Sequence, residues 1–236
     1  MDFQHLLNVI IKFLAANYVS SEIAGISMTL RSQQRWLEWA REIQGLAQTG
    51  QQYAENDYQR ARNQRLIEIA AEIISDHTEL QYGDVADIYK SQIGYATPRV
   101  DVRGAVFRDQ KILLVQERID GGWTLPGGWV DVGDKPSEAV EREVWEEAGF
   151  RVKARKVIGI YDANRVSPFE LFHAFKIVFF CKIIDGQARP SDETLDVRFF
   201  GQDEIPATLS GERTQPRQIV DAYSLLTNPN KAAVFD

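Results

Sequence analysis

The sequence is poor in residues that form cross-links or soft metal sites, with one cysteine, Cys181, and three histidines among 236 residues. An intrachain disulfide is excluded, and a structural zinc site with four cysteine or histidine ligands is not expected. A reducing, cytoplasmic setting fits such a chain best. The sequence also lacks any apolar run near the ~20 residues that a membrane span requires, so the chain is not expected in a membrane.

Basic residues are in deficit as well, because 27 lysines and arginines against 34 acidic residues give a formal net charge of −7. This balance argues against nucleic acid as a partner held mainly through phosphate contacts. A small phosphate-bearing substrate would need a metal ion between it and the acidic side chains. With 44% hydrophobic and 26% charged residues, the composition is that of a globular protein of one or two domains.

Residues 1–31 form an apolar segment whose large side chains follow helical spacing: Phe3, Leu6, Leu7, Ile10, Phe13 and Leu14. We predict an amphipathic N-terminal extension that packs on a neighbouring element. Two alternatives stay open. Either the segment docks on a membrane surface, or Met28 is the physiological start and the segment is an addition before it.

Residues 32–98 are predicted to form a small all-α domain. Helices are expected from Ser32 to Gly50, from Asn56 to Ser75 and from Asp84 to Gln92. In the first helix, the stripe expected to face the core is Trp36, Trp39, Ala40, Ile43, Leu46 and Ala47. Such stripes are extensive for short helices, so this domain is expected to mediate a homodimer.

The pattern changes at Gly94–Pro98. Helical spacing of apolar residues gives way there to the residue-by-residue alternation typical of a strand, and we place a domain boundary at this point. Residues 99–236 are predicted to be mixed α+β. Strands are expected near 100–106, 112–116, 152–160, 171–184 and 195–200, and a closing helix over 215–226.

The candidate chemistry lies in a loop and helix that span 127–150. Pro136 suits the first turn of the helix and Gly149 its end. At 100° per residue, Glu143, Glu146 and Glu147 fall within an arc of about 100°. Crowded carboxylates repel one another, so a hard divalent cation such as Mg²⁺ is the expected guest. For such a pattern alone, a solvated acidic face is the ordinary explanation.

The acidic pattern is not alone, because residues 128–150 resemble the Nudix box. The matching positions are Gly128, Arg142, Glu143, Val144, Glu146, Glu147 and Gly149. Two positions depart, since Asp134 stands where the family has Glu and Phe150 replaces an aliphatic residue. In the family, the acid matched by Asp134 helps to anchor the arginine matched by Arg142. The helical domain followed by the box also resembles the bacterial Nudix subgroup that includes CDP-choline pyrophosphatase and proteins labelled ADP-ribose pyrophosphatases.

The resemblance implies a Nudix-type α/β/α sandwich, with a mixed sheet between helices, after the all-α domain. It implies Mg²⁺-dependent hydrolysis, with Mn²⁺ able to substitute, of the pyrophosphate bond in a nucleoside diphosphate linked to another group. The substrate would be similar to CDP-choline or ADP-ribose, and the products a nucleoside monophosphate and a phosphorylated moiety.

The resemblance also assigns roles to residues of the box. Glu143, Glu146, Glu147 and the backbone carbonyl of Gly127 would hold the metal, and Arg142 would belong to the catalytic set. The general base would be Glu143 or a downstream acid. Glu193 is the candidate for that acid, with Asp192 and Asp196 competing for the role.

Substrate contacts are predicted from position alone. Arg103 and Arg118 lie on strands that flank the box and are candidates for phosphate binding. Trp123 or Phe172 could stack on a base. Asp162 and Arg165 lie in a loop suited to substrate choice.

Two other functions share the box. A Nudix-fold sensor would bind a nucleotide and report through the helical domain without turnover, although retention of all three glutamates argues against it. An RNA-processing enzyme would share the metal site but expects a basic groove, which a net charge of −7 does not indicate.

Overall fold

A computed structural model describes residues 29–163, 171–211 and 213–236, and the chain divides into two compact units. The first unit contains the described residues up to Pro98 together with Leu171–His173, and the second contains the rest. Of the expected N-terminal extension, only 29–31 are described, and they begin the first labelled helix. None of the helices in the described ranges is long and apolar enough to cross a membrane.

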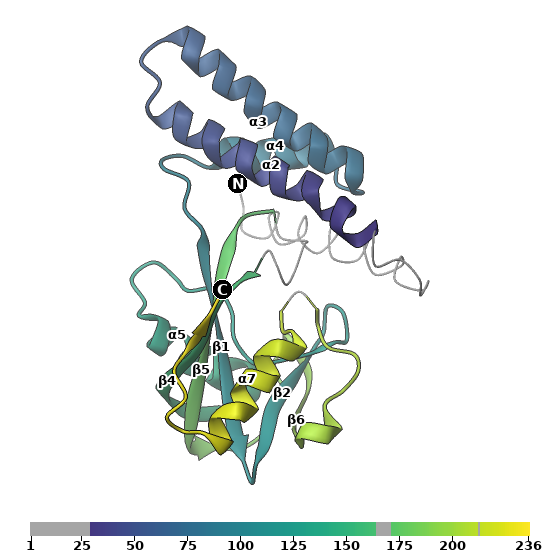
Figure 1. The fold of residues 1–236 in the computed structure, drawn as a ribbon, viewed down its shortest axis with the longest axis vertical. Helices are drawn as coiled ribbons and strands as arrows, with labels where there is room; N and C mark the ends of the chain where they lie inside the picture. The colour runs from purple at the N-terminus through teal and green to yellow at the C-terminus, as the bar shows by residue number, and fades with distance from the viewer. Residues whose placement is uncertain (1–28, 164–170, 212) are drawn as a thin grey trace. The chain divides into compact units, whose positions relative to one another are not determined.

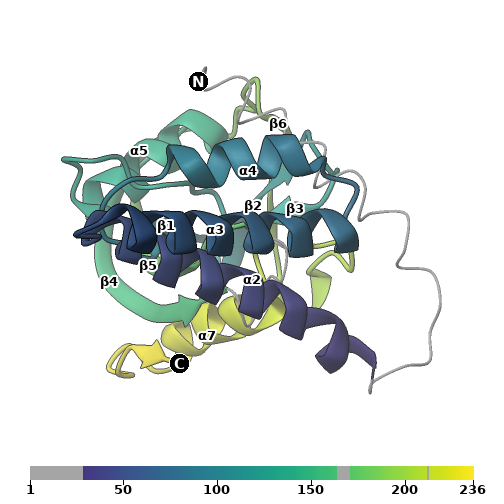
Figure 2. The same cartoon turned by 90° about the horizontal axis from the view of Figure 1, so that it is seen from above.

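The first unit is a helical hairpin with a third helix packed on it (Figures 1 and 2). Its helices are α2 (Thr29–Gln52), α3 (Asp57–His77) and α4 (Tyr82–Ser91). Asn56 caps α3, because its Oδ1 accepts a hydrogen bond of 2.9 Å from the Gln59 N–H. The core is lined by side chains of all three helices: Leu37, Ala40, Ala47, Ile67, Ala70, Ala71, Ile74, Val85, Ile88 and Tyr89.

The expected inward stripe of α2 is wrong at two of its large residues. Trp39 is 51% exposed and Leu46 is 67% exposed. Their inward neighbours are small or polar, because Ala40 and Ala47 are buried beside Gln44 and Gln48. Gln44 donates to Gln48 Oε1 at 2.8 Å, and Gln48 donates to the Gly94 carbonyl at 3.1 Å. Paired amides can be buried without an unmet hydrogen bond, so α2 buries Gln44 and Gln48 together with Leu37, Ala40 and Ala47 and leaves Trp39 and Leu46 outside.

The second unit is built on a sheet with the strand order β3-β2-β1-β5-β4-β7, and β6 pairs with β2. The strands are β1 (Arg99–Arg108), β2 (Lys111–Glu117), β3 (Trp123–Thr124), β4 (Phe150–Asp162), β5 (Ala174–Gly186), β6 (Thr194–Phe200) and β7 (Val234–Phe235). The helices are α5 (Pro136–Ala148), the short η2 (Gln202–Glu204) and α7 (Pro216–Thr227). Asp109 and Gln110, both with positive φ, form the turn between β1 and β2. This is the expected mixed α+β fold, with one boundary moved: β5 begins at Ala174, and Leu171–His173 group with the first unit.

Two apolar clusters lie on opposite faces of the sheet, one under α5 and one under α7, which gives an α/β/α sandwich (Figure 1). Successive side chains of a strand point to opposite faces of the sheet, so neighbouring residues of one strand belong to different clusters. Val102 and Val106 of β1 pack with Val140 and Val144 of α5, whereas Ala105 packs with the α7 cluster.

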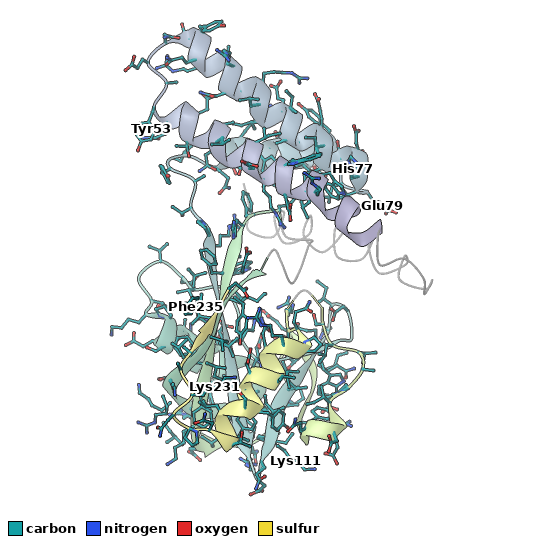
Figure 3. The ribbon with its side chains drawn as sticks, in the orientation of Figure 1. Tyr53, His77, Glu79, Lys111, Lys231 and Phe235 are labelled. Carbon is teal, nitrogen blue, oxygen red and sulfur yellow. The ribbon has the colours of Figure 1, made fainter. Side chains whose placement is uncertain are left out.

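The C-terminal segment closes the β4 side of the sheet. β7 pairs in parallel with Gly159 and Ile160 of β4. Lys156 Nζ on β4 donates to the Pro229 carbonyl at 2.9 Å and to the Lys231 carbonyl at 2.6 Å. Lys231, labelled in Figure 3, in turn donates to Ser224 of α7 at 2.7 Å. These contacts tie the tail to both a strand and a helix.

The hairpin strands β1 and β2 pair with each other only next to their turn, at Phe107 with Ile112 and Arg108 with Lys111. Beyond that point, residues 123–130 fill the gap between them. Their first part pairs with β2, as Thr124 lies opposite Val115. Their second part bonds to β1, through Gly104 N–H to the Pro126 carbonyl and Val102 N–H to the Gly128 carbonyl, both at 2.8 Å. We call residues 123–130 the wedge segment.

We predict that Gly104→Ala lowers the stability of the second unit. A Cβ on Gly104 would lie 2.6 Å from Val144 Cγ2 and 3.3 Å from Val140 Cγ2, so α5 would have to move away from β1. Overpacking of this kind costs about 1–3 kcal/mol, which should lower the melting temperature by several degrees. As the control, Gly211→Ala adds a Cβ that meets nothing within 4 Å and should leave melting unchanged or slightly raised. Equal melting of the two variants would contradict close packing of α5 on β1.

Candidate active site

The wedge segment brings a glycine to the end of α5. Gly127 has φ +150°, and a Cβ there would lie 2.0 Å from the Val102 carbonyl oxygen, so only glycine fits against β1. Its N–H donates to Glu147 Oε2 at 2.8 Å. None of the hydrogen bonds between described residues uses the Gly127 carbonyl. The backbone at Gly127 therefore holds one carboxylate of the box and offers an oxygen beside it.

Glu147 is the buried carboxylate of the box, with 5% of its surface exposed. Burial, together with the nearby charge of Glu117, raises its pKa to about 8, although Arg103, the Gly127 N–H and Arg213 oppose the rise. Its backbone is fixed as well, because Thr194 Oγ1 donates to the Glu147 carbonyl at 3.0 Å. In the absence of a cation, Glu147 therefore carries a proton near neutral pH.

Arg142 lies among the other acids of the box. Its Nη1 is 2.7 Å from Glu143 Oε1 and 3.2 Å from Glu146 Oε2. Its Nη2 is 3.4 Å from Asp134 Oδ2 and 3.5 Å from Asp131 Oδ2. The short side chain of Asp134 therefore does reach the arginine, although Asp131 contacts it at a similar distance. Burial raises the pKa of Glu143, and the Arg142 charge opposes that rise.

The donor set of the box suits a hard divalent cation in its chemistry. Carboxylates and a backbone carbonyl are the ligands that Mg²⁺ takes, and the wedge segment meets Glu147 at Gly127 and Glu143 at Gly128. Among the described residues, however, no three acidic, histidine or cysteine side chains already form a metal-binding group. Arg142 and the Glu147 proton neutralise these acids instead, so binding a cation requires that Arg142 yield and that Glu147 lose its proton.

Arg103 was expected to reach substrate phosphates, and the structure places it in the interior instead. It is almost fully buried and donates to both carboxylate oxygens of Asp101, at 2.9 and 2.6 Å, and to the Leu125 carbonyl at 3.3 Å. Lys176 Nζ lies 3.7 Å from Asp101 Oδ1. Although burial opposes ionisation, the charges of Arg103 and Lys176 keep the pKa of Asp101 below its ordinary value. Through its hydrogen bond to the Leu125 carbonyl, Arg103 therefore helps to hold the wedge segment in place.

Neither aromatic residue expected to stack on a base is available in the second unit. Trp123 is 8% exposed and packs edge-on against Phe200, with ring centroids 4.8 Å apart. Phe172 groups with the first unit, where its ring meets Tyr89 at 5.8 Å. The exposed aromatic residue of the wedge segment is Trp129, 42% exposed and next to Gly128. Alternation could have found it, because Val130 packs into the α5 cluster and its neighbour must face the other way.

Arg118 and Glu193 are brought together by a backbone contact. The Arg118 N–H donates to the Glu193 carbonyl at 2.9 Å, and Arg118 Nε donates to the Asp192 carbonyl at 2.8 Å. Arg118 therefore holds the loop that carries Glu193. The Glu193 charge adds to the rise in the pKa of both Glu143 and Glu117. Asp196, in contrast, is paired with Arg198.

Of the two remaining candidates, Asp162 is the last residue of β4. The Asp162 N–H donates to Asp236 Oδ2 at 2.8 Å, so this position is tied to the C-terminal residue. Arg165 lies outside the described residues.

Two charged residues of the site were missed by sequence reasoning. Glu117 at the end of β2 is buried, and Arg213, just before α7, lies 3.4 Å from its Oε1 through Nη1. Glu117 is a charged residue at the end of the largely buried strand β2, which is a weak signal for a functional position. Arg213 has no sequence signal, because it lies in an irregular loop.

Comparison with known proteins gives two family matches. A profile described as "NUDIX domain" matches residues 97–223, and one described as "UDP-X-like, N-terminal oligomerisation domain" matches residues 34–89. A putative ADP-ribose pyrophosphatase of Bacillus subtilis is 36% identical over 208 residues, covering 88% of this chain and all of that protein. An ADP-ribose pyrophosphatase of Methanocaldococcus jannaschii is 34% identical over 115 residues, covering 48% of this chain and 67% of that protein.

Solved structures agree with these matches. The crystal structure of a UDP-X diphosphatase is similar with a TM-score of 0.55 at 29% identity, covering 86% of this chain and 99% of that one. The crystal structure of an ADP-ribose pyrophosphatase from Streptococcus suis is similar with a TM-score of 0.54 at 36% identity, covering 59% of this chain and 100% of that one.

The raised pKa of Glu147 predicts a pH dependence of stability in chelator. The folded protein keeps a proton on Glu147 up to about pH 8, whereas the unfolded chain loses it near its ordinary value of 4.5. The contribution of Glu147 to the free energy of unfolding is therefore greatest below pH 4.5, falls as the pH rises above that value, and is lost once the pH has passed through about 8. Glu147→Gln cannot ionise, so its melting temperature should fall less than that of the wild type between pH 5 and 9.

The control is Glu138→Gln, which changes an exposed glutamate in the first turn of the same helix. It should keep the pH profile of the wild type. Parallel melting profiles for the wild type and Glu147→Gln would show that Glu147 is ionised in the folded protein throughout this range.

Proposed function

We propose, since the chain belongs to the Nudix family, that it hydrolyses the pyrophosphate bond of a nucleoside diphosphate linked to another group. The products are a nucleoside monophosphate and the phosphorylated moiety. The observation that carries this proposal is the bond from the Gly127 N–H to the buried Glu147 carboxylate, next to Glu143 and Arg142. It joins the wedge segment to the end of α5, 20 residues further along the chain.

The metal proposed for this site is Mg²⁺, with Mn²⁺ able to substitute. Glu143, Glu146, Glu147 and the Gly127 carbonyl would hold it, and when bound it would supply charge neutralisation and activation of water. The proton on Glu147 is lost on binding, so ligation at neutral pH releases it to solvent.

The protein's own groups position the substrate and move the proton. Glu193 is proposed as the general base because its loop is held by Arg118 and its charge is felt at Glu143. Glu143 remains the alternative base, being mostly buried and paired with Arg142. Arg142 is proposed to release Glu143 and Glu146 when the cation takes its place among them.

The substrate class is proposed from the relatives and the exposed Trp129. ADP-ribose and UDP-linked compounds follow from the names of the similar proteins, and CDP-choline from the subgroup resemblance. Trp129 offers its ring to a base, and stacking accepts any base, so it does not select among adenine, uracil and cytosine. A nucleotide sensor without turnover and an RNA-processing enzyme remain the rival functions.

Activity should depend on Glu147. We expect Mg²⁺-dependent release of AMP, UMP or CMP from a panel of ADP-ribose, UDP-glucose, CDP-choline and a short RNA, followed by chromatography. Glu147→Gln should lower kcat by about 10³-fold or more with the fold retained, because it removes a charged ligand. Glu138→Gln on the same helix should keep activity. Nucleotide binding without release of any product would favour the sensor, and turnover of the RNA alone would favour RNA processing.

We propose that the protein is a homodimer formed through its helical unit. Trp39 and Leu46 are exposed and seven residues apart, so they lie on one face of α2, and the exposed Tyr53 follows directly after the helix. Tyr53, labelled in Figure 3, lies where α2 turns toward α3. The matching family description for residues 34–89 is an oligomerisation domain, which supports this use of the helical unit. A cytoplasmic location is proposed on the buried, unpaired Cys181.

Leu46→Glu should convert the protein from a dimeric to a monomeric mass in light scattering at micromolar concentration. The glutamate would be buried without a partner in the interface, which costs several kcal/mol for each copy. Ile184→Glu is the matched control, because Ile184 is as exposed as Leu46 but lies on β5. A monomeric wild type, or a dimer that survives Leu46→Glu and not Ile184→Glu, would contradict the assignment of the interface.

A further inference from the structure

The loop before α7 is bonded along its length to the wedge segment. The Trp123 N–H donates to the Thr208 carbonyl and the Ser210 N–H to the Trp123 carbonyl, both at 2.9 Å. At the other end of the loop, Thr214 Oγ1 accepts from the Leu125 N–H at 2.9 Å and lies 2.8 Å from Thr124 Oγ1. These contacts fix residue 213 beside the strand that leads to Gly127.

Arg213 extends from this loop to a buried acid. Its Nη1 lies 3.4 Å from Glu117 Oε1, longer than a charge-assisted hydrogen bond, and Glu117 Oε1 has no hydrogen-bond partner among the described residues. Glu117 is 2% exposed, so its carboxylate needs the cation close by. Burial, with the charges of Asp120 and Glu193, raises the pKa of Glu117, and Arg213 opposes the rise.

The rest of the Arg213 guanidinium is available to a ligand. The side chain is 30% exposed, and the described part of the chain provides no hydrogen bond to its other nitrogens. The neighbouring Thr214 is bonded to Thr124 and Leu125, so Arg213 lies beside the part of the wedge segment that leads to Gly127. A guanidinium fixed at one edge presents its remaining N–H groups as a fork, the geometry that suits phosphate oxygens.

We propose that Arg213 binds the pyrophosphate bridge of the substrate and that Glu117, buried behind it, is a positioning residue for its guanidinium. The inference rests on the proposed function, which puts a pyrophosphate next to Glu147. It adds a direct phosphate ligand on the α7 side of the wedge segment, where Arg103 cannot serve because it is committed to Asp101.

Binding of magnesium methylenediphosphonate, a pyrophosphate analogue that carries no base and cannot be hydrolysed, tests Arg213 by calorimetry. Arg213→Ala should weaken the affinity at least 10-fold, and Arg213→Lys should restore only part of it, because lysine lacks the fork. Arg155→Ala removes an exposed arginine of β4 and should bind as the wild type does. Melting temperatures of all variants should stay within a few degrees of the wild type.

Glu117 is tested through its coupling to Arg213. Glu117→Ala should weaken binding several-fold, and Glu117→Gln should rescue part of the loss because the amide oxygen can still accept from the guanidinium. In an Arg213→Ala background, Glu117→Ala should cost no further affinity, which a merely structural role would not produce.

The outcomes separate this inference from the hydrolase proposal. If the wild type turns over nucleotides and Arg213→Ala binds the analogue normally, the phosphate role of Arg213 is overturned while the hydrolase stands. If no nucleotide is turned over but analogue binding still depends on Arg213, the phosphate site stands and the hydrolase proposal falls. A wild type that does not bind the analogue at all overturns the phosphate site.

Discussion

The divergence of β1 from β2 is the constraint on which the site depends. The two strands pair for only two residues each at their hairpin, and the space that opens between them must be filled by backbone whose polar groups are satisfied. Residues 123–130 meet that demand by bonding to β2 first and to β1 afterwards. The crowding leaves room only for glycine at 127, and the same crowding turns its N–H toward Glu147. The segment that fills the space between β1 and β2 therefore also places the Gly127 N–H beside Glu147.

A second theme is charge buried in the second unit. Asp101, Arg103 and Glu117 are almost fully buried, and Glu147 lies close enough for Arg103 and Glu117 to shift its pKa. Desolvating so many ions costs stability that apolar side chains would not. Such a cluster fits a site that holds a protonated acid, Glu147, and a fixed arginine, Arg103, before a cation and a substrate bind. Opposite charges within the cluster keep Asp101 ionised, whereas Glu147 stays protonated because burial outweighs its partners.

Sequence reasoning succeeded where local rules decide the structure. Pro136 and Gly149 bound α5, as expected from the pattern. It failed where the direction in which a side chain points depends on partners distant in sequence. Trp39 was assigned to the core by its helical spacing, yet the inward face of α2 is decided by what α3 and α4 present to it. Arg103 was assigned to substrate phosphates because pattern alone does not show that Asp101 and Lys176 face the same side. Arg213 reaches the site only through a loop bonded to Trp123 and Leu125, and no local rule predicts that pairing.

The grouping of Leu171–His173 with the helices has a consequence for how this protein can be rearranged in evolution or by recombination. The helical unit is not a cassette that ends at Pro98, because the ring of Phe172, from a stretch between β4 and β5, packs on Tyr89. A gene fusion that transplanted only the N-terminal portion would leave that contact behind, and a catalytic unit moved alone would carry an orphaned apolar stretch. Moving either unit alone would therefore separate the ring of Phe172 from that of Tyr89.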